Sequence, residues 1–190
     1  SIYRKGPYRI SSGQEYRAWD FGHVTIVMGD DYVPGVGRIE DANRGPSLGV
    51  IADQAHRLRG FIGLNHGGYH RQEADSLALE GKMDFLELLQ FGAYRYLGLE
   101  GWYDFLNIGT RWPIVGASDF PYTRELGDNI TYVYSEKEPT VRRFMELIAR
   151  GESFVTSGPM LFVKVNGKRP GEFITLEKKQ ETTLNVEVEV

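Results

Sequence analysis

Four short apolar runs, three of them followed by helix-like segments, constrain the fold of this chain more than any other feature. The runs span residues 24–28, 61–65, 83–89 and 112–118. After the first run, Ser47 is a favourable helix cap, and apolar residues recur at helical spacing until Gly60. The third run is ambiguous by periodicity alone, and its position favours a strand. Strands that alternate with helices are typical of parallel strands joined by right-handed crossovers, so we expect an α/β fold.

The sequence changes character after Gly151. Alternating β-type patterns occupy residues 153–156, 160–165 and 182–190. Asn166-Gly167 is a strong hairpin signal and predicts that the strand before it pairs with residues 173–176. We therefore expect residues 1–150 to form an α/β domain and residues 151–190 to be an antiparallel, β-rich extension.

Composition excludes several classes of function. The absence of cysteine excludes disulfide frameworks, zinc fingers, iron–sulfur sites and cysteine nucleophiles. The net charge of −4 comes without a basic stripe, which disfavours a nucleic-acid partner. No apolar run approaches the roughly 18 residues that a membrane-spanning helix needs. We expect a soluble protein, cytoplasmic or exported, that acts on a small molecule. Its oligomeric state is left open by the sequence.

Two polar residues directly follow apolar runs. His66 directly follows the run at 61–65 and precedes Gly67-Gly68. Asp119 directly follows the run at 112–118. The carboxyl ends of strands are where α/β folds place ligands and metals. The alternatives are a turn histidine bonded to backbone and an aspartate that caps a helix. The second is weakened because the residues after Asp119 are not amphipathic.

Two further residues complete a candidate metal set. His23 directly precedes the run at 24–28, and Glu15 lies eight residues earlier in a polar stretch. Each is unremarkable alone, because most glutamates are solvated and a single histidine is a weak signal. Together with His66 and Asp119 they form a plausible ligand set for Zn, Mn or Fe, although their spacing is not a recognised local motif.

Other charged residues have weaker support. His70 lies four residues after His66, but the intervening glycines disfavour a helix, so we expect it to contact substrate rather than metal. Arg111 and Arg124 flank the Asp119 strand and are candidates to bind an anionic group, with surface arginines as the common alternative. His56 lies within the helix that follows Ser47 and is expected to face solvent.

In their order along the chain, these residues resemble the CehA/McbA type of metallohydrolase, in the PHP (polymerase and histidinol phosphatase) superfamily. The matching segments are Gly13-Gln14-Glu15, Gly22-His23, Asn65-His66-Gly67-Gly68 and Gly116-Ala117-Ser118-Asp119-Phe120. Further segments follow in the expected order: Gly151 to Leu161 with its Thr156-Ser157-Gly158-Pro159, then Val165-Asn166-Gly167 and Pro170-Gly171. The resemblance covers nearly the whole chain, from Gly13 to Gly171.

The resemblance implies the C-terminal part of a distorted (β/α)7 barrel, followed by the start of a β-rich region. It implies Glu15 as a bridging carboxylate, His23 and His66 as imidazole ligands, and Asp119 as a late aspartate ligand. It also implies divalent ions, two or more in the full protein, and hydrolysis of a phosphoester, ester, amide or carbamate. In that reaction His70 is a candidate general acid or substrate ligand, and Arg111 a candidate anion-binding group.

Two departures from the family pattern matter. The opening His-x-His pair and the early Asp-His element have no counterpart, and they would precede Gly13. Because the chain begins at Ser1 rather than Met and its last residues read as a strand, we expect it to be the C-terminal part of a longer protein and to lack full activity alone. In addition, Pro121 stands where the family has a histidine two residues after the aspartate, which puts one metal position in doubt.

A second hypothesis comes from a different class of protein. A degenerate, non-catalytic barrel would use its aromatic loops to hold a glycan or a protein partner. Trp19, Trp112 and the 11 tyrosines would then matter more than the histidines. Metal content separates the two hypotheses, because only the hydrolase requires a transition metal.

Overall fold

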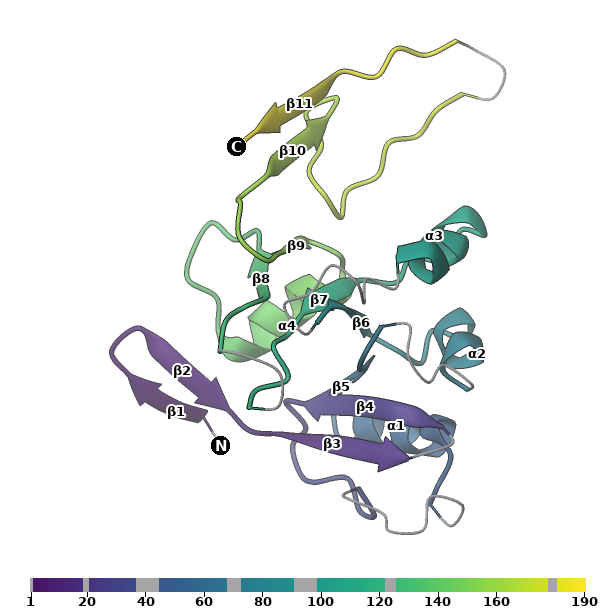
Figure 1. Ribbon diagram of the computed structural model, residues 1–190, viewed down its shortest axis with the longest axis vertical. Helices are drawn as coiled ribbons and strands as arrows, with labels where there is room; N and C mark the ends of the chain where they lie inside the picture. The colour runs from purple at the N-terminus through teal and green to yellow at the C-terminus, as the bar shows by residue number, and fades with distance from the viewer. Residues whose placement is uncertain are drawn as a thin grey trace.

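A five-stranded sheet forms the centre of the molecule in the computed structural model (Figure 1). The structure describes residues 2–18, 21–36, 45–67, 73–90, 99–121, 126–177 and 181–190. In spatial order the strands are β3 (Gly13–Ala18), β4 (Gly22–Val27), β5 (Phe61–Leu64), β6 (Phe85–Leu89) and β7 (Ile114–Gly116). The ambiguous run at 83–89 is thus a strand, and the fold is mixed α/β, as the sequence predicts.

Strand direction follows the prediction on one side of the sheet only. β5, β6 and β7 are parallel, whereas β4 is antiparallel to both β3 and β5, so the expectation of parallel strands is wrong at β4. Two contacts explain this. The Tyr16 hydroxyl, beside the start of β4, donates to the Pro46 carbonyl at 2.5 Å, and the Asp30 N–H, beyond the end of β4, donates to the Leu58 carbonyl at 2.7 Å. The chain therefore returns along β4 to Tyr16 before the helix that follows Ser47 begins. This helix then runs in the same direction as β4, so that β5 starts beside the end of β4 and is antiparallel to it.

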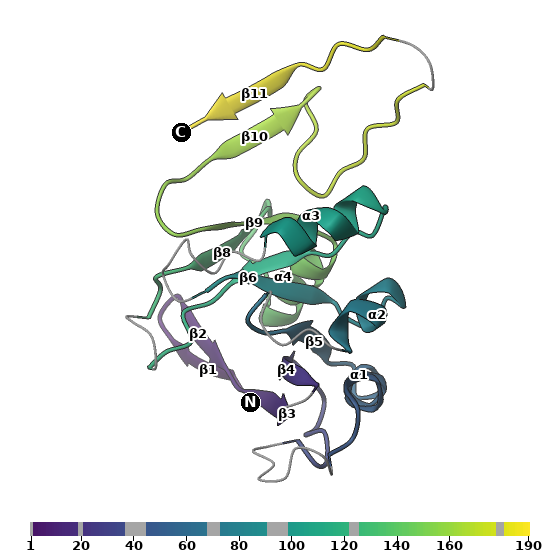
Figure 2. The same ribbon diagram turned by 45° about the vertical axis from the view of Figure 1, so that its right-hand side comes forward.

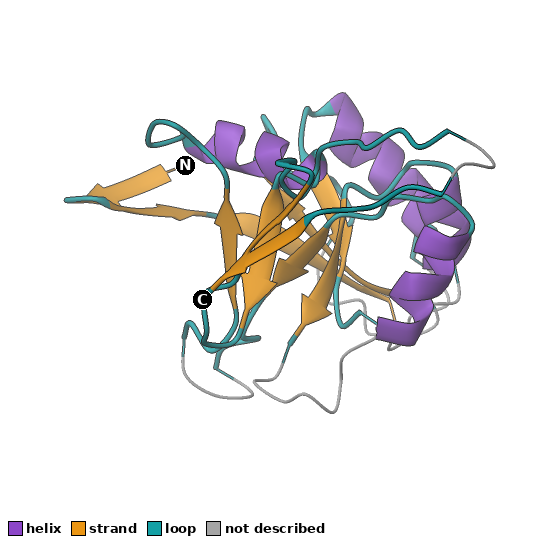
Figure 3. Cartoon of the chain, turned by 90° about the horizontal axis from the view of Figure 1, so that it is seen from above, coloured by secondary structure: helices purple, strands orange, loops and turns teal. Residues whose placement is uncertain are grey.

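The helices α1 (Leu48–Arg57), α2 (Ala74–Leu79) and α3 (Leu99–Asn107) lie along one side of this sheet (Figure 2). Ser47 caps α1 as predicted, because its side chain accepts the Val50 N–H. Viewed from above in Figure 3, the helices lie outside the curved set of strands. Within the described ranges, no helix has the length and apolarity to cross a membrane.

The two faces of the sheet differ in chemistry because side chains alternate along each strand. The buried apolar face includes Val24 and Ile26 of β4 and Ile62 and Leu64 of β5, which form one core cluster with Ile51 and Ala55 of α1. On β4 the alternate residues His23 and Thr25 point to the opposite face and are only partly buried. The apolar face holds the helices, which leaves the other face available for polar side chains.

The remaining strands form separate two-stranded pairs. β1 (Ile2–Lys5) pairs with β2 (Tyr8–Ser11), and β8 (Ile130–Val133) pairs with β9 (Ser153–Thr156). Between β8 and β9 lies α4 (Val141–Ala149), capped by Thr140. In the described part of the chain no sheet closes on itself, so the implied (β/α)7 barrel is not observed. Because β9 pairs with β8, antiparallel pairing also crosses the expected boundary at residue 150.

The predicted hairpin at Asn166-Gly167 has a different partner from the one expected. Both residues adopt positive φ, 49° and 74°, as a tight hairpin turn requires. However, β10 (Phe162–Val165) pairs with β11 (Val186–Glu189), and residues 173–176 are not a strand, so that pairing prediction is wrong. Phe173 instead packs over the Arg111 guanidinium, at 4.3 Å from its ring centre. The segment after the turn therefore lies against Arg111, the residue three positions before β7.

The helical His56 is not simply solvated. Its Nε2 lies 3.0 Å from Asp84 Oδ2, an atom that also accepts the Ile62 N–H at 2.8 Å. This hydrogen bond holds the pKa of His56 above its ordinary value of 6.5, against the lowering that burial causes. Asp53 acts in the same direction as Asp84, and Lys82 opposes them.

We predict that this pair makes stability depend on pH. Because the pKa of His56 is raised in the folded state, its stabilisation is complete below about pH 6.5 and is lost as pH rises through the folded-state pKa. Urea unfolding of the native protein and His56→Gln at several pH values measures the difference. The difference in free energy of unfolding between the native protein and His56→Gln should be largest in acid and should disappear in mild alkali. The neighbouring substitution Arg57→Gln should show no such dependence on pH. A gap that does not vary with pH contradicts this assignment.

Candidate metal centre

Three of the predicted ligands meet on the polar face of the sheet. Glu15, His23 and His66 each offer a ligand atom, and these atoms lie within 4.8 Å of one another. His23 Nδ1 is 3.0 Å from His66 Nε2 and 3.6 Å from Glu15 Oε1. Strand register explains the geometry, because Arg17 pairs with His23 and Glu15 with Thr25, which places Glu15 diagonally across from His23.

The loop after β5 carries His66 to the cluster. The Asn65 N–H donates to the His23 carbonyl at 2.9 Å, which ties the end of β5 to the start of β4. The Asn65 side chain accepts from the Thr25 hydroxyl at 2.7 Å and donates to Glu15 Oε1 at 3.2 Å. His66 itself has a φ of 57°, in the left-handed region that few non-glycine residues adopt. Such backbone strain is concentrated at functional sites.

Gly67 fixes this loop against β6. Its N–H donates to the Glu87 carbonyl at 2.7 Å. A Cβ atom at this position would lie 2.2 Å from the same carbonyl oxygen, so only glycine fits. The glycine after His66 therefore allows a close approach to the backbone of β6.

Glu87, which the sequence analysis missed, lies behind His66. Its Oε2 accepts the His66 backbone N–H at 2.8 Å and lies 3.6 Å from His66 Nδ1, and only 7% of the residue is exposed. Burial raises the pKa of Glu87, and the charges of Asp119 and Glu15 add to this, whereas the His66 N–H lowers it. The sequence feature that could have identified Glu87 is its position as a glutamate within the apolar run at 83–89.

Gln90 is the second residue that was missed. It is buried, and its side-chain amide contacts His66 Nδ1. A side-chain amide can donate to an imidazole nitrogen or accept from it. The atom in contact is the amide nitrogen of Gln90, which donates to Nδ1; turning the amide over would bring its oxygen there as an acceptor, and a proton held on Nδ1 would leave the lone pair of His66 Nε2, the atom that faces His23, for a cation.

The other predicted site residues lie elsewhere. Asp119 follows β7 at the same edge of the sheet, with a φ of 48°, but it is not among the three residues whose ligand atoms meet. Arg111 precedes β7, at the opposite end of that strand, and its Nη2 donates to the Gly171 carbonyl at 3.0 Å. The structure therefore does not bring Arg111 to the cluster. His70 and Arg124 lie outside the described residues.

Comparison with known proteins adds a structural likeness. Neither protein-family models nor curated proteins give a match to this sequence. Among solved structures, the fold is similar to that of a two-domain protein from Bacteroides vulgatus that contains a predicted PHP-like metal-dependent phosphoesterase. The TM-score is 0.51 at 20% identity, over 76% of this chain and 43% of that protein. At this identity the likeness concerns the mixed α/β fold alone. The chain spans less than half the length of that protein.

Proposed function

We propose that this chain carries part of the active site of a metal-dependent hydrolase. The observation that carries the proposal is the convergence of Glu15, His23 and His66 at one edge of the sheet. The solved structure with a similar fold, described as containing a predicted metal-dependent phosphoesterase, supports the same class of chemistry. The proposal includes three further points: a hydrolase of the CehA/McbA type, a distorted (β/α)7 barrel, and cleavage of a phosphoester, ester, amide or carbamate bond.

The chemistry of the donor set fits a divalent transition metal. Two imidazoles and one carboxylate are the ligand set of many catalytic zinc sites, which retain an open position for water or substrate. The His23 and His66 side chains are 16% and 12% exposed, and that of Glu15 is 37% exposed. The donors are therefore shielded but accessible. Asp119 is proposed as a ligand for a further ion.

The surrounding residues would hold these donors in place. Asn65 orients Glu15 through its amide, and Glu87 and Gln90 orient His66 through its backbone and its Nδ1. A bound Zn, Mn or Fe ion would supply Lewis acidity and lower the pKa of a coordinated water to about 7. His70, outside the described residues, is proposed as a general acid or a substrate ligand.

Loading the site is expected to stabilise the folded protein. A ligand that binds only the folded state adds about 2.7 kcal/mol at a hundredfold excess over its Kd. Differential scanning calorimetry of chelator-treated protein, with zinc or manganese added back, should show a rise in Tm. Magnesium is a matched control, because an imidazole-rich site disfavours this hard cation.

The function itself is tested by hydrolysis. The protein as its gene encodes it is assayed with p-nitrophenyl phosphate, p-nitrophenyl acetate and a p-nitroanilide, after removal of metal and after its return. We expect metal-dependent release of p-nitrophenol or p-nitroaniline from at least one of these. A protein that gains neither stability nor activity with zinc, manganese or iron contradicts the proposal and favours a non-catalytic binding module.

A further inference from the structure

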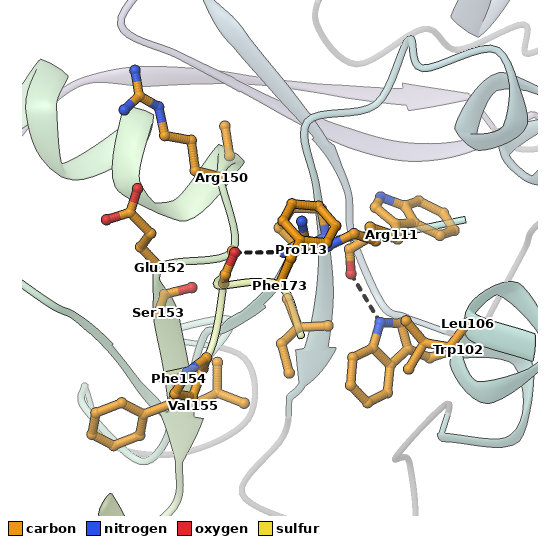
Figure 4. Close-up of a pocket in the computed structure, with 16 residues that line it drawn as sticks. Trp102, Leu106, Arg111, Pro113, Arg150, Glu152, Ser153, Phe154, Val155 and Phe173 are labelled. Atoms are coloured by element: carbon orange, nitrogen blue, oxygen red, sulfur yellow. Dashed lines mark hydrogen bonds between the residues drawn. The ribbon is translucent and has the colours of Figure 1, made fainter. Parts of the chain in front are cut away.

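A second pocket lies at the other end of β7 from the metal centre, with a volume of about 730 Å³ (Figure 4). Trp102 and Leu106 of α3 form one wall, and Ser153, Phe154 and Val155 of β9 form the opposite wall. Residues 111–114 and the segment 170–173 complete it. Its volume falls within the range of small-molecule sites, about 300–1,000 Å³.

The walls of this pocket are fixed by specific contacts. Gly171, with a φ of 91°, approaches Gly151 so closely that a Cβ would lie 2.7 Å from the Gly151 carbonyl oxygen. Arg111 donates to the Gly171 carbonyl from across the pocket, and Trp102 Nε1 donates to the Trp112 carbonyl at 2.9 Å. The cavity therefore does not depend on a ligand for its shape, which lowers the entropic cost of binding.

The lining combines aromatic surface with positive charge. Trp102, Trp112 and Phe173 are aromatic residues of the lining, whereas the ring of Phe154 stacks on Tyr132 at 5.2 Å between ring centres. Arg111 and Arg150 outnumber Glu152, the single acidic residue of the lining. In the part of the chain that the structure describes, Arg111 forms no ion pair. Its guanidinium has five N–H donors, of which one is bonded to Gly171, so it retains donors for an anion.

We propose that this pocket binds a small aromatic carboxylate. The ring of the ligand packs between Trp102 and the β9 wall, and its carboxylate pairs with Arg111. A planar carboxylate suits a planar guanidinium, and a partly desolvated charge pair adds specificity to apolar burial. The site is separate from the metal centre, because Arg111 precedes β7 whereas His66 follows β5, at opposite ends of these parallel strands.

Isothermal titration calorimetry with 2-naphthoate tests this site. We expect saturable binding with one ligand per chain, and binding of the neutral 2-naphthamide at least tenfold weaker. Arg111→Gln should weaken naphthoate binding at least tenfold. Leu106→Trp, which fills the pocket from its partly exposed rim, should abolish binding without lowering the Tm. Arg59→Gln, at an exposed arginine remote from the pocket, is the matched control.

A His66→Ala variant separates this pocket from the metal centre and should bind naphthoate as the native protein does. The proposal is overturned if naphthoate fails to bind, if binding survives both Arg111→Gln and Leu106→Trp, or if it is lost in His66→Ala. Equal affinity for naphthamide overturns the assignment of an anionic ligand.

Discussion

His66→Ala is expected to lower zinc affinity at least about a hundredfold and to reduce metal-dependent hydrolysis to background. Loss of even an indirect partner of a metal ligand typically costs about 10- to 100-fold, so loss of a direct ligand should cost at least as much. His66 also connects the cluster to its support, because its Nε2 faces His23 while its Nδ1 contacts Gln90. Alanine removes both links at once.

The measurement for His66→Ala is zinc titration against a competing chelator, followed by the p-nitrophenyl assays. His56→Ala is the matched control, because His56 lies in α1 and pairs with Asp84, outside the cluster. It should retain native zinc affinity. Circular dichroism checks that both variants fold. Native zinc affinity in a folded His66→Ala would show that His66 is not a ligand.

Gly67→Ala is expected to destabilise the folded protein strongly. The new Cβ would lie 2.2 Å from the Glu87 carbonyl oxygen and about 3 Å from further backbone atoms of β6, none of which can rotate away. Overpacking of this kind costs about 1–3 kcal/mol, and a clash with backbone belongs at the upper end of that range. Relief of the clash would push His66 away from Glu87, so metal affinity should fall with stability.

Gly158→Ala provides the matched control for Gly67→Ala. Gly158 has open space around its Cβ position and no positive φ, so alanine should fit there without strain. Urea unfolding of both variants gives the difference in free energy of unfolding. Equal stability of the two variants would contradict the close packing of the His66 loop on β6.

Local sequence signals predicted the elements better than their partners. Ser47 and the apolar spacing after it located α1, and the run at 61–65 located β5. The direction of β4 was predicted wrongly, because it depends on where the chain travels between residues 28 and 46 rather than on the residues of β4. The partner of β10 was also predicted wrongly, since Asn166-Gly167 specifies a turn but not which later segment pairs after it.

For the candidate site too, local sequence signals located individual residues better than they predicted which residues lie together. Position at the end of an apolar run brought His66 to attention, and His23 and Glu15 joined it because they lie just before the run at 24–28 and in the polar stretch upstream of it. Their roles as ligands remain predictions. Glu87 was missed because a glutamate in a strand is unremarkable until the His66 N–H is seen to point at it. Arg111 was proposed as an anion-binding group because it flanks the strand that Asp119 follows, but it precedes that strand, at the end opposite to Asp119.

Anomalous X-ray diffraction from crystals soaked in zinc or manganese tests the metal centre most directly. Data collected at the metal absorption edge locate the ion without reference to activity. We predict a strong anomalous peak between Glu15, His23 and His66, with bonds of about 2.0–2.2 Å to imidazole nitrogen and carboxylate oxygen. A peak at any other place in the molecule, with these three side chains unliganded, would contradict the assignment of this cluster as the metal site.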